Sequence, residues 1–371
     1  YGGPGYGRLL DVLADVGAVR SFGYDWRLSN RHTAQLLAAR VDGWLEEWRR
    51  STGNRDTKII FVCHSMGGLV ARYYLEVLGG REHARRLITL GTPYRGSVNA
   101  IRALTGDAFG KLRPFGRHTA LTEVARSFPA LWELLPTYRC VAGANGPVGL
   151  AEASLTDLPA GAMASGLSFH AEIATAVARN SPPPYQLHAY AGKRQATWQS
   201  LTVDHGRRAY RRSQRDRDHR GDGTVPLFSA VPPEWPSTEE ATLQAVRHGG
   251  LCLSTTVLDL VLDKIEPLDM GDVLAPACEL GLDLPDIASG SEPIGVSVDS
   301  DRRDLLLHAR LEHPVTGRLI AEASMTPDGA GGYQAELDPA PGTWRVVVEA
   351  IAERPRVRVE DLITVLASRD L

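Results

Sequence analysis

Three residues of the kind that together perform nucleophilic catalysis occur along this chain in the order serine, aspartate, histidine. Ser65 lies in "FVCHSMGGLV", Asp222 in "RGDGTVP" and His248 in "VRHGG". A serine hydroxyl is a poor nucleophile at neutral pH, so it needs a histidine to accept its proton and a carboxylate to hold that histidine in the right tautomer. The three residues therefore predict acyl transfer through a covalent intermediate on Ser65, which requires no metal ion and no organic cofactor.

The stretch around Ser65 predicts how the serine is presented. The β-forming residues from Ile59 to Val62 precede it, and two glycines and a helical pattern follow it. A strand that turns sharply into a helix strains its turning residue and needs small neighbours, so that the two elements can approach closely. Ser65 would stand at the tip of this turn, and His64 would pack beside it without acting as the base. The backbone N–H of Met66 would bind the developing oxyanion.

Other aspartates and histidines compete for the acid and base roles by residue type. Asp216 and Asp218 lie in a polar run that is typical of an exposed loop. His205 and His219 precede or adjoin Asp222, whereas hydrolases with this strand-to-helix turn carry serine, acid and histidine in that order. The order favours the aspartate of "RGDGTVP" and the histidine of "VRHGG".

The elements that must position these residues alternate between helical and strand patterns. Apolar residues spaced three and four apart indicate helices, and short runs of β-formers indicate strands. This alternation predicts a parallel sheet flanked by helices, an α/β-hydrolase fold over residues 1–267. The predicted elements are a helix ending before Gly17, a strand over 19–24, a helix from Ser29 or Asn30, a strand over 59–62, a helix over 66–78 and a strand over 86–90.

Between residues 97 and 184 the alternation stops, over a segment too long for an ordinary connection. We expect this segment to form a cap over Ser65, after which sheet character returns at residues 185–191. Its apolar residues would either line an acyl-binding cleft or form the small core of the cap itself; they include Phe128, Leu131, Trp132 and Leu135.

The carboxyl-terminal sequence follows a different pattern of secondary structure. Short strands separated by Gly, Pro and Asp predict an antiparallel, immunoglobulin-like β-sandwich over residues 290–371, joined to the hydrolase by a linker over 268–289. Because all three candidate catalytic residues precede it, we expect the sandwich to be dispensable for bond cleavage. It would help the enzyme to find its substrate or a partner, whose identity the sequence does not give.

The charge balance excludes a general attraction to nucleic acid. With 41 Lys and Arg against 44 Asp and Glu, the formal net charge is −3, which creates no strong field of either sign. A local basic run, "RRAYRRSQRDRDHR" over residues 207–220, predicts a solvated loop or, as the alternative, a patch that meets anionic lipid headgroups.

The cysteines and apolar runs bear on the compartment. Cys63, Cys140, Cys252 and Cys278 are scattered without zinc-binding spacing, so we expect thiols. No apolar run approaches the roughly 18 residues of a membrane-spanning helix, and no cleavable signal opens the chain. These features predict a cytoplasmic protein, with secretion left open because an upstream segment could precede the abrupt start.

Taken together, the motifs resemble the lecithin:cholesterol acyltransferase family of α/β-hydrolases, which includes lysosomal phospholipase A2 and bacterial lipase-like members. The resemblance covers roughly residues 1–265. It rests on "YDWR" (24–27), "HSMGG" (64–68), "LGTPYRGS" (90–97), "LLP" (134–136), "GDGTVP" (221–226) and His248.

The resemblance implies an ester acyl group, often on a lipid, that moves from Ser65 to water or to an alcohol, with peripheral membrane contact as a corollary. Hydrolase and O-acyltransferase both remain open, as does a non-catalytic binding protein on a hydrolase fold. Cys63 departs from the family pattern by replacing the first glycine of the turn. The second oxyanion donor should lie upstream, so either the amino terminus is truncated or the glycines of "YGGPGYG" supply it.

Overall fold

The computed structural model of the chain describes residues 5–109, 118–153, 155–180, 182–265, 279–290, 293–329, 332–351 and 357–367. Cys278, residues 1–4 and residues 268–278, half of the expected linker, lie outside these ranges. The remaining three cysteines are free thiols, as expected. None of the described helices is long and apolar enough to cross a membrane.

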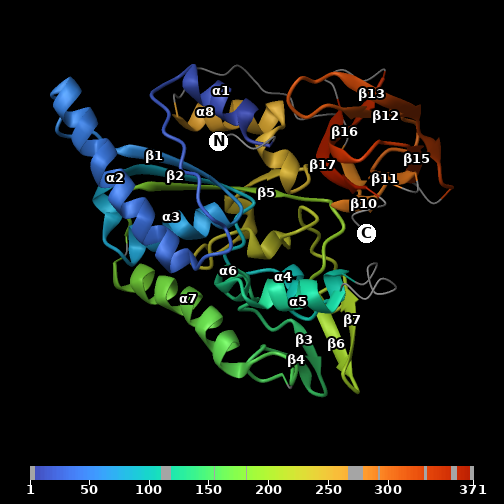
Figure 1. The fold of residues 1–371 in the computed structure, drawn as a ribbon, viewed down its shortest axis with the longest axis horizontal. Helices are drawn as coiled ribbons and strands as arrows, with labels where there is room; N and C mark the ends of the chain where they lie inside the picture. Colours follow the sequence, from blue (N-terminus) through green and yellow to red (C-terminus); the bar gives the residue numbers. More distant parts are fainter. Residues whose placement is uncertain are drawn as a thin grey trace.

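The central sheet consists of four parallel strands in the order β1-β2-β5-β8 (Figure 1). Neighbouring residues of β2 are buried on opposite faces: Leu87 packs with α2 and α3, and Ile88 packs with α1 and α8. A parallel sheet that is covered on both faces defines a layered α/β architecture. The elements are α1 (Gly7–Ala14), α2 (Asn30–Thr52), β1 (Ile59–His64), α3 (Met66–Glu76), β2 (Ala84–Leu90), β5 (Gln186–Gly192), β8 (Thr242–Gln244) and α8 (Thr255–Ile265).

Helix α2 begins where the sequence predicted. The Ser29 hydroxyl accepts a hydrogen bond from the Arg31 N–H and caps the helix. The strand predicted over residues 19–24 is wrong, because these residues have no regular secondary structure. Phe22 and Tyr24 still pack against the core. Strand-forming residues make a strand only where a neighbour supplies ladder hydrogen bonds, and β1 is the outer strand of the described sheet on this side.

The inserted segment forms helices and a small sheet of its own, in the order β4-β3-β6-β7. Val141 of β3 pairs with Leu201 of β6, so a hairpin beyond residue 184 belongs to this sheet. The predicted boundary at 184 is therefore too early. The elements are α4 (Val98–Leu104), α5 (His118–Arg126), α6 (Pro129–Trp132), β3 (Val141–Gly143), β4 (Gly146–Val148), α7 (Ala160–Arg179), β6 (Ser200–Asp204) and β7 (Arg207–Arg211).

The sequence left open whether the apolar residues of the insertion line an acyl-binding cleft or form its own core, and the structure places them differently. Trp132 and Leu135 are buried in the insertion's own core, and Leu131 packs against it. Phe128 lies nearer the surface, where its ring meets Trp26 edge-on at 5.4 Å between centroids. Trp132 and Leu135 therefore form part of the insertion's own core.

The carboxyl-terminal part is a sandwich of two sheets, β10-β17-β16-β12-β13 and β14-β15-β11-β9, which share one apolar core. The predicted linker is wrong over residues 280–289: β9 pairs with β11 and β10 pairs with β17, so these residues belong to the sandwich. The α/β-hydrolase fold with a β-rich carboxyl-terminal region is thus confirmed. The strands are β9 (Leu280–Asp283), β10 (Ile287–Ser289), β11 (Ile294–Ser300), β12 (Leu307–Glu312), β13 (Leu319–Ser324), β14 (Thr326–Pro327), β15 (Gly332–Leu337), β16 (Gly342–Ala350) and β17 (Arg358–Leu366).

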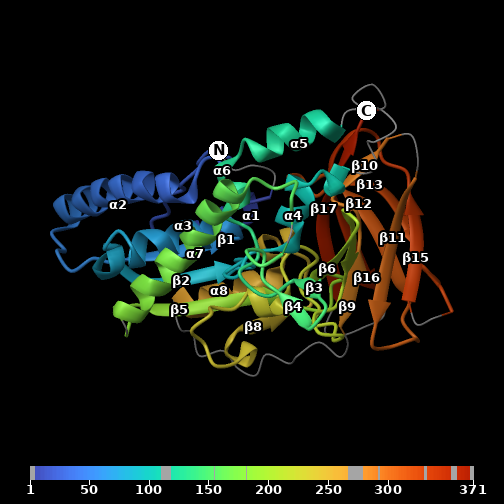
Figure 2. The same ribbon diagram turned by 90° about the horizontal axis from the view of Figure 1, so that it is seen from below.

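The sandwich lies directly against the hydrolase part. Figures 1 and 2 both place β17 on the side of the sandwich that faces the central sheet, and β15 on the far side. Strand β17 contacts the short 3-10 helix η5 (Gly249–Cys252), which follows His248.

Candidate active site

Ser65, His248 and Asp222 form one continuous hydrogen-bonded series. The Nε2 of His248 lies 2.8 Å from Ser65 Oγ, and its Nδ1 lies 2.7 Å from Asp222 Oδ2. Because the carboxylate only accepts, Nδ1 carries the proton and Nε2 is left to accept from the serine hydroxyl. The structure therefore brings together the three residues that the sequence singled out.

Ser65 occupies the tip of the turn between β1 and α3, in a strained backbone conformation with φ 51° and ψ −129°. The Ser65 N–H donates to the Leu90 carbonyl oxygen at 2.8 Å, and the Thr92 hydroxyl donates to the Ser65 carbonyl oxygen at 2.8 Å. A Cβ at Gly68 would overlap Thr92 Oγ1, so only glycine allows this close approach. The "LGTP" segment thus holds the strained turn, a role that sequence reasoning did not assign.

Asp222 is fully buried in the loop that follows β7, and its other oxygen is occupied. Oδ1 accepts from the N–H groups of Thr224 and Val225 at 2.9 and 2.6 Å. Its backbone oxygen accepts from the His248 N–H at 2.8 Å. The side chain and the backbone of Asp222 therefore both fix the loop of the histidine.

Two opposing effects act on the pKa of His248. Burial lowers this pKa, but the charge of Asp222 and its hydrogen bond outweigh burial, so the pKa lies above its usual value. Asp361 and Asp286 of the sandwich raise it further. A histidine that gains affinity for a proton beside a serine hydroxyl is suited to accept the proton of that hydroxyl.

His64 forms hydrogen bonds to Tyr6 and to the backbone of His248, and neither bond reaches Ser65. Its Nε2 donates to the carbonyl oxygen of His248 at 3.0 Å, which leaves Nδ1 to accept from the Tyr6 hydroxyl at 2.9 Å. Burial and the neighbouring His248 lower the pKa of His64 to about 3, so its ring is neutral at physiological pH. His64 therefore supports the backbone of His248.

Met66 is the first residue of α3, so the helix itself leaves its N–H without an acceptor. This N–H directly follows Ser65 at a helix amino terminus, which is the position expected for the oxyanion donor. Of the glycine-rich start that could supply a second donor, residues 1–4 lie outside the described residues.

The competing residues lie elsewhere. Asp218 accepts from Gln199 Nε2 at 2.7 Å, and Asp216 occupies a left-handed turn conformation with φ 60°. The side chain of His205 is 93% exposed, and the ring of His219 packs against Phe228. Neither aspartate forms the hydrogen bond to His248 that Asp222 forms.

The basic run over 207–220 is only partly the loop that the sequence predicted, because its first residues form β7. Arg212 and Arg220 lie 3.7 and 3.8 Å from Asp283 and Asp299 of the sandwich. These two arginines therefore face acidic residues of the same chain.

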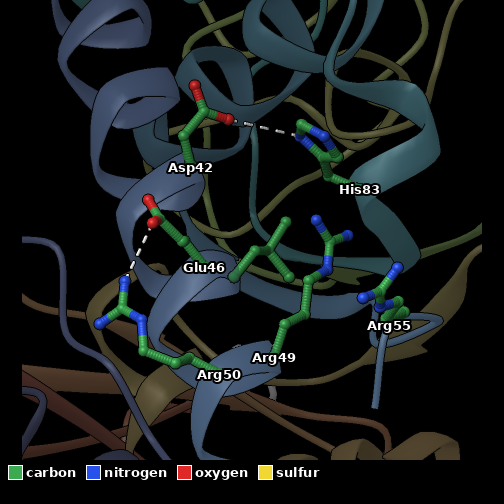
Figure 3. Close-up of a pocket in the computed structure, with 7 residues that line it drawn as sticks. Asp42, Glu46, Arg49, Arg50, Arg55 and His83 are labelled. Atoms are coloured by element: carbon green, nitrogen blue, oxygen red, sulfur yellow. Dashed lines mark hydrogen bonds and ion pairs between the residues drawn. The ribbon is translucent and has the colours of Figure 1, made fainter. Parts of the chain in front are cut away.

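A separate open pocket of about 510 Å³ lies near the carboxyl end of α2 (Figure 3). Within it Glu46 pairs with Arg50 at 2.9 Å, and Asp42 lies 3.8 Å from His83. Its lining includes none of Ser65, Asp222 and His248.

Comparison with known proteins agrees with the motif pattern. Residues 7–149 match the family described as Lecithin:cholesterol acyltransferase. Among curated protein sequences, none matches this chain.

Three solved structures are similar over larger parts of the chain. The mature form of Bacillus licheniformis lipase BlEst2 is 16% identical to this chain. The match spans 65% of this chain and 74% of the lipase chain, with a TM-score of 0.32. The propeptide form of the same lipase is 17% identical, with coverages of 91% and 63% and a TM-score of 0.34. Phospholipase PlaB from Legionella pneumophila is 12% identical, with coverages of 98% and 90% and a TM-score of 0.28. These scores are low, so the fold assignment rests on the sheet topology.

Proposed function

We propose that this chain, which resembles the lecithin:cholesterol acyltransferase family over residues 7–149, is a serine hydrolase of carboxylic esters, with lipid acyl esters as its substrate class. The observation that carries the proposal is the hydrogen-bonded series from Ser65 through His248 to Asp222. The family match supports the wider class of lipid-acting hydrolases and acyltransferases.

In the first half of the reaction, Ser65 Oγ attacks the ester carbonyl carbon while His248 Nε2 takes the hydroxyl proton. The carbonyl oxygen gains the negative charge, and the Met66 N–H donates to it. Asp222 stabilises the imidazolium that has formed but remains ionised itself. His248 then returns the proton to the leaving alcohol as the carbon–oxygen bond breaks, which leaves the acyl group on Ser65.

In the second half, an acceptor oxygen attacks the acyl carbon and gives its proton to His248. The tetrahedral intermediate collapses, the bond to Ser65 breaks and His248 returns the proton to Oγ. Water as acceptor releases a free acid, whereas an alcohol gives a new ester. The family name favours the alcohol as a second candidate, and the choice depends on how well the closed site excludes water.

Peripheral membrane contact is supported by exposed apolar side chains near the insertion. Trp26 is 52% exposed and touches Phe128, which follows α5. Leu121 and Val124, one helical turn apart on α5, are also exposed. Exposed apolar groups of this kind favour contact with a lipid surface.

A fluorophosphonate probe tests the proposal, because it reacts covalently with activated serines. We expect the full chain to be labelled and peptide mass spectrometry to place the adduct on Ser65, with Ser65→Ala as the unlabelled control. An adduct on another serine would refute the assignment. No labelling at all would favour the alternative of a binding protein on a hydrolase fold.

Mixed lipids identify the substrate and the acceptor. Wild-type protein and Ser65→Ala are incubated with phospholipid vesicles, with and without a long-chain alcohol, and the products are read by mass spectrometry. Free acid that is absent from the Ser65→Ala sample supports hydrolysis, and a new ester supports transfer. Identical lipid profiles for the two proteins would exclude lipids of these classes as substrates.

A further inference from the structure

We propose that the carboxyl-terminal sandwich is part of the catalytic apparatus, because it positions the loops of both His248 and Asp222. We call the structural basis the interdomain contact: the pair between Arg247 and Asp361, and the hydrogen bonds from Gln195 to β9. This inference rests on the proposed function, since it assigns positioning roles within that site.

Arg247, the residue directly before His248, inserts between the two domains. Its Nε donates to Asp361 Oδ2 of β17 at 2.6 Å, and one terminal nitrogen donates to the Leu282 carbonyl oxygen of β9 at 3.1 Å. The side chains of Arg247 and Asp361 are only 7% and 6% exposed. Breaking such a buried pair is costly, because loss of either partner leaves an uncompensated buried charge.

The residues directly after His248 also lie against the sandwich. A Cβ at Gly249 would lie 2.6 Å from Asp361 Oδ1, and a Cβ at Gly250 would overlap the Glu360 carbonyl oxygen. The backbone of this loop therefore rests directly on β17, where no side chain fits between them. The residue before His248 and the two residues after it therefore all contact β17.

Gln195 connects the sandwich to the loop of the acid. Its side chain is fully buried; the Oε1 accepts from the Leu282 N–H of β9, and the Nε2 donates to the Leu280 carbonyl oxygen at 3.4 Å. Its own N–H donates to the Gly221 carbonyl oxygen at 3.0 Å, next to Asp222. The two strands β9 and β17 therefore reach the acid loop and the base loop separately.

Charge complementarity surrounds this contact. Basic residues of the hydrolase part lie opposite acidic residues of the sandwich. The pairs are Lys193 and Arg194 with Glu279, Arg212 with Asp283, Arg220 with Asp299, and Arg247 with Asp286. Each contains a partly or well exposed partner, so each contributes little stability but favours one orientation of the domains. These contacts favour a catalytic role for the sandwich over the expectation that it is dispensable for bond cleavage.

Asp361→Asn in the full chain tests the proposal, because it removes the charge 2.6 Å from Arg247 without touching the hydrolase sequence. We expect kcat on a soluble short-chain ester to fall about tenfold, with KM changed less than about twofold, because misplacing a catalytic group lowers turnover more than binding. The rate of fluorophosphonate labelling of Ser65 should fall with kcat. Asp304→Asn, which removes an exposed acid of the sandwich that pairs with Arg302 of the same domain, is the matched control and should keep wild-type rates.

Folding is checked by thermal unfolding, and the paired variant Arg247→Met with Asp361→Leu is used if the single variant does not fold, because it leaves no lone buried charge. Wild-type kcat and labelling in a folded variant would overturn the positioning role. An equal loss in the Asp304→Asn control would also overturn it, since the effect would then not be specific to the interdomain contact. Absence of labelling in the wild-type protein would instead refute the proposed function.

Discussion

The Thr92 hydroxyl donates to the Ser65 carbonyl oxygen at 2.8 Å and fills the space in which a side chain on Gly68 would lie. One hydroxyl therefore holds the strained turn and limits how closely α3 approaches the segment that follows β2. We predict that Gly68→Ala destabilises the fold by about 1–3 kcal/mol, because the added methyl group overpacks this contact. Urea denaturation measures the change.

Gly43→Ala is the control for that substitution. Gly43 lies in α2, where a Cβ would have no other atom within 4 Å, so alanine there should stabilise the protein by roughly 0.5–1 kcal/mol. Equal effects of the two substitutions would show that the close approach at Gly68 does not limit the fold.

Asp222→Asn should preserve the fold and lower kcat by about 10⁴, because the amide no longer holds His248 in the right tautomer. The Asp222 charge also raises the pKa of His248. Activity requires neutral His248, so in the wild-type protein kcat/KM falls as the pH is lowered through the raised pKa of this histidine. In Asp222→Asn that pKa is lower, so the acidic limb of the residual kcat/KM should shift to lower pH. Asp218→Asn, which alters an aspartate that bonds to Gln199 instead of His248, should leave both the rate and the pH profile unchanged.

His170 predicts a component of acid destabilisation. Burial lowers its pKa to about 4, and its Nε2 donates to the Glu133 carbonyl oxygen at 2.7 Å. The unfolded chain binds a proton near pH 6.5 and the folded chain only near pH 4, so stability falls as the pH drops across this interval, by on the order of 3 kcal/mol. His170→Gln should flatten the dependence of urea midpoint on pH. His205→Gln, at an exposed position, should reproduce the wild-type slope.

Trp26→Ser should reduce hydrolysis of vesicle lipid severalfold and leave hydrolysis of a soluble short-chain ester within about twofold, because the exposed indole contributes to surface binding. Leu306→Ser removes an exposed apolar side chain from the sandwich instead and should alter neither activity. A parallel loss on both substrates in Trp26→Ser would assign that residue to the fold or the site.

The sequence predicted elements best where a local pattern determines the structure. The run from Ile59 to the glycines after Ser65 forms the strand, turn and helix expected of it, and Ser29 caps α2. Residues 19–24 have the composition of a strand but lack a ladder partner, which no local pattern reveals. The order of Ser65, Asp222 and His248 in the chain also predicted which residues come together.

Long-range contacts determined the rest. Gln195, Arg247 and Asp361 carry no motif, and their relationship depends on the packing of β9 and β17 against two loops. Leu280–Asp283 looked like a linker because one short apolar run between prolines does not show which sheet it will join. Thr92 lies in a motif, but its hydrogen bond to Ser65 depends on the pairing of β1 with β2, which the local sequence does not reveal.

The partner of Arg247 follows it by 114 residues in the sequence. Synthesis proceeds from the amino terminus, so Ser65, Asp222 and His248 all leave the ribosome well before β17 does. During that interval Arg247 has no Asp361 to bind, and Gly249 and Gly250 have no strand to rest on. The loop of the histidine thus acquires its contacts with β17 only late in translation, after Ser65, Asp222 and His248 themselves have been made.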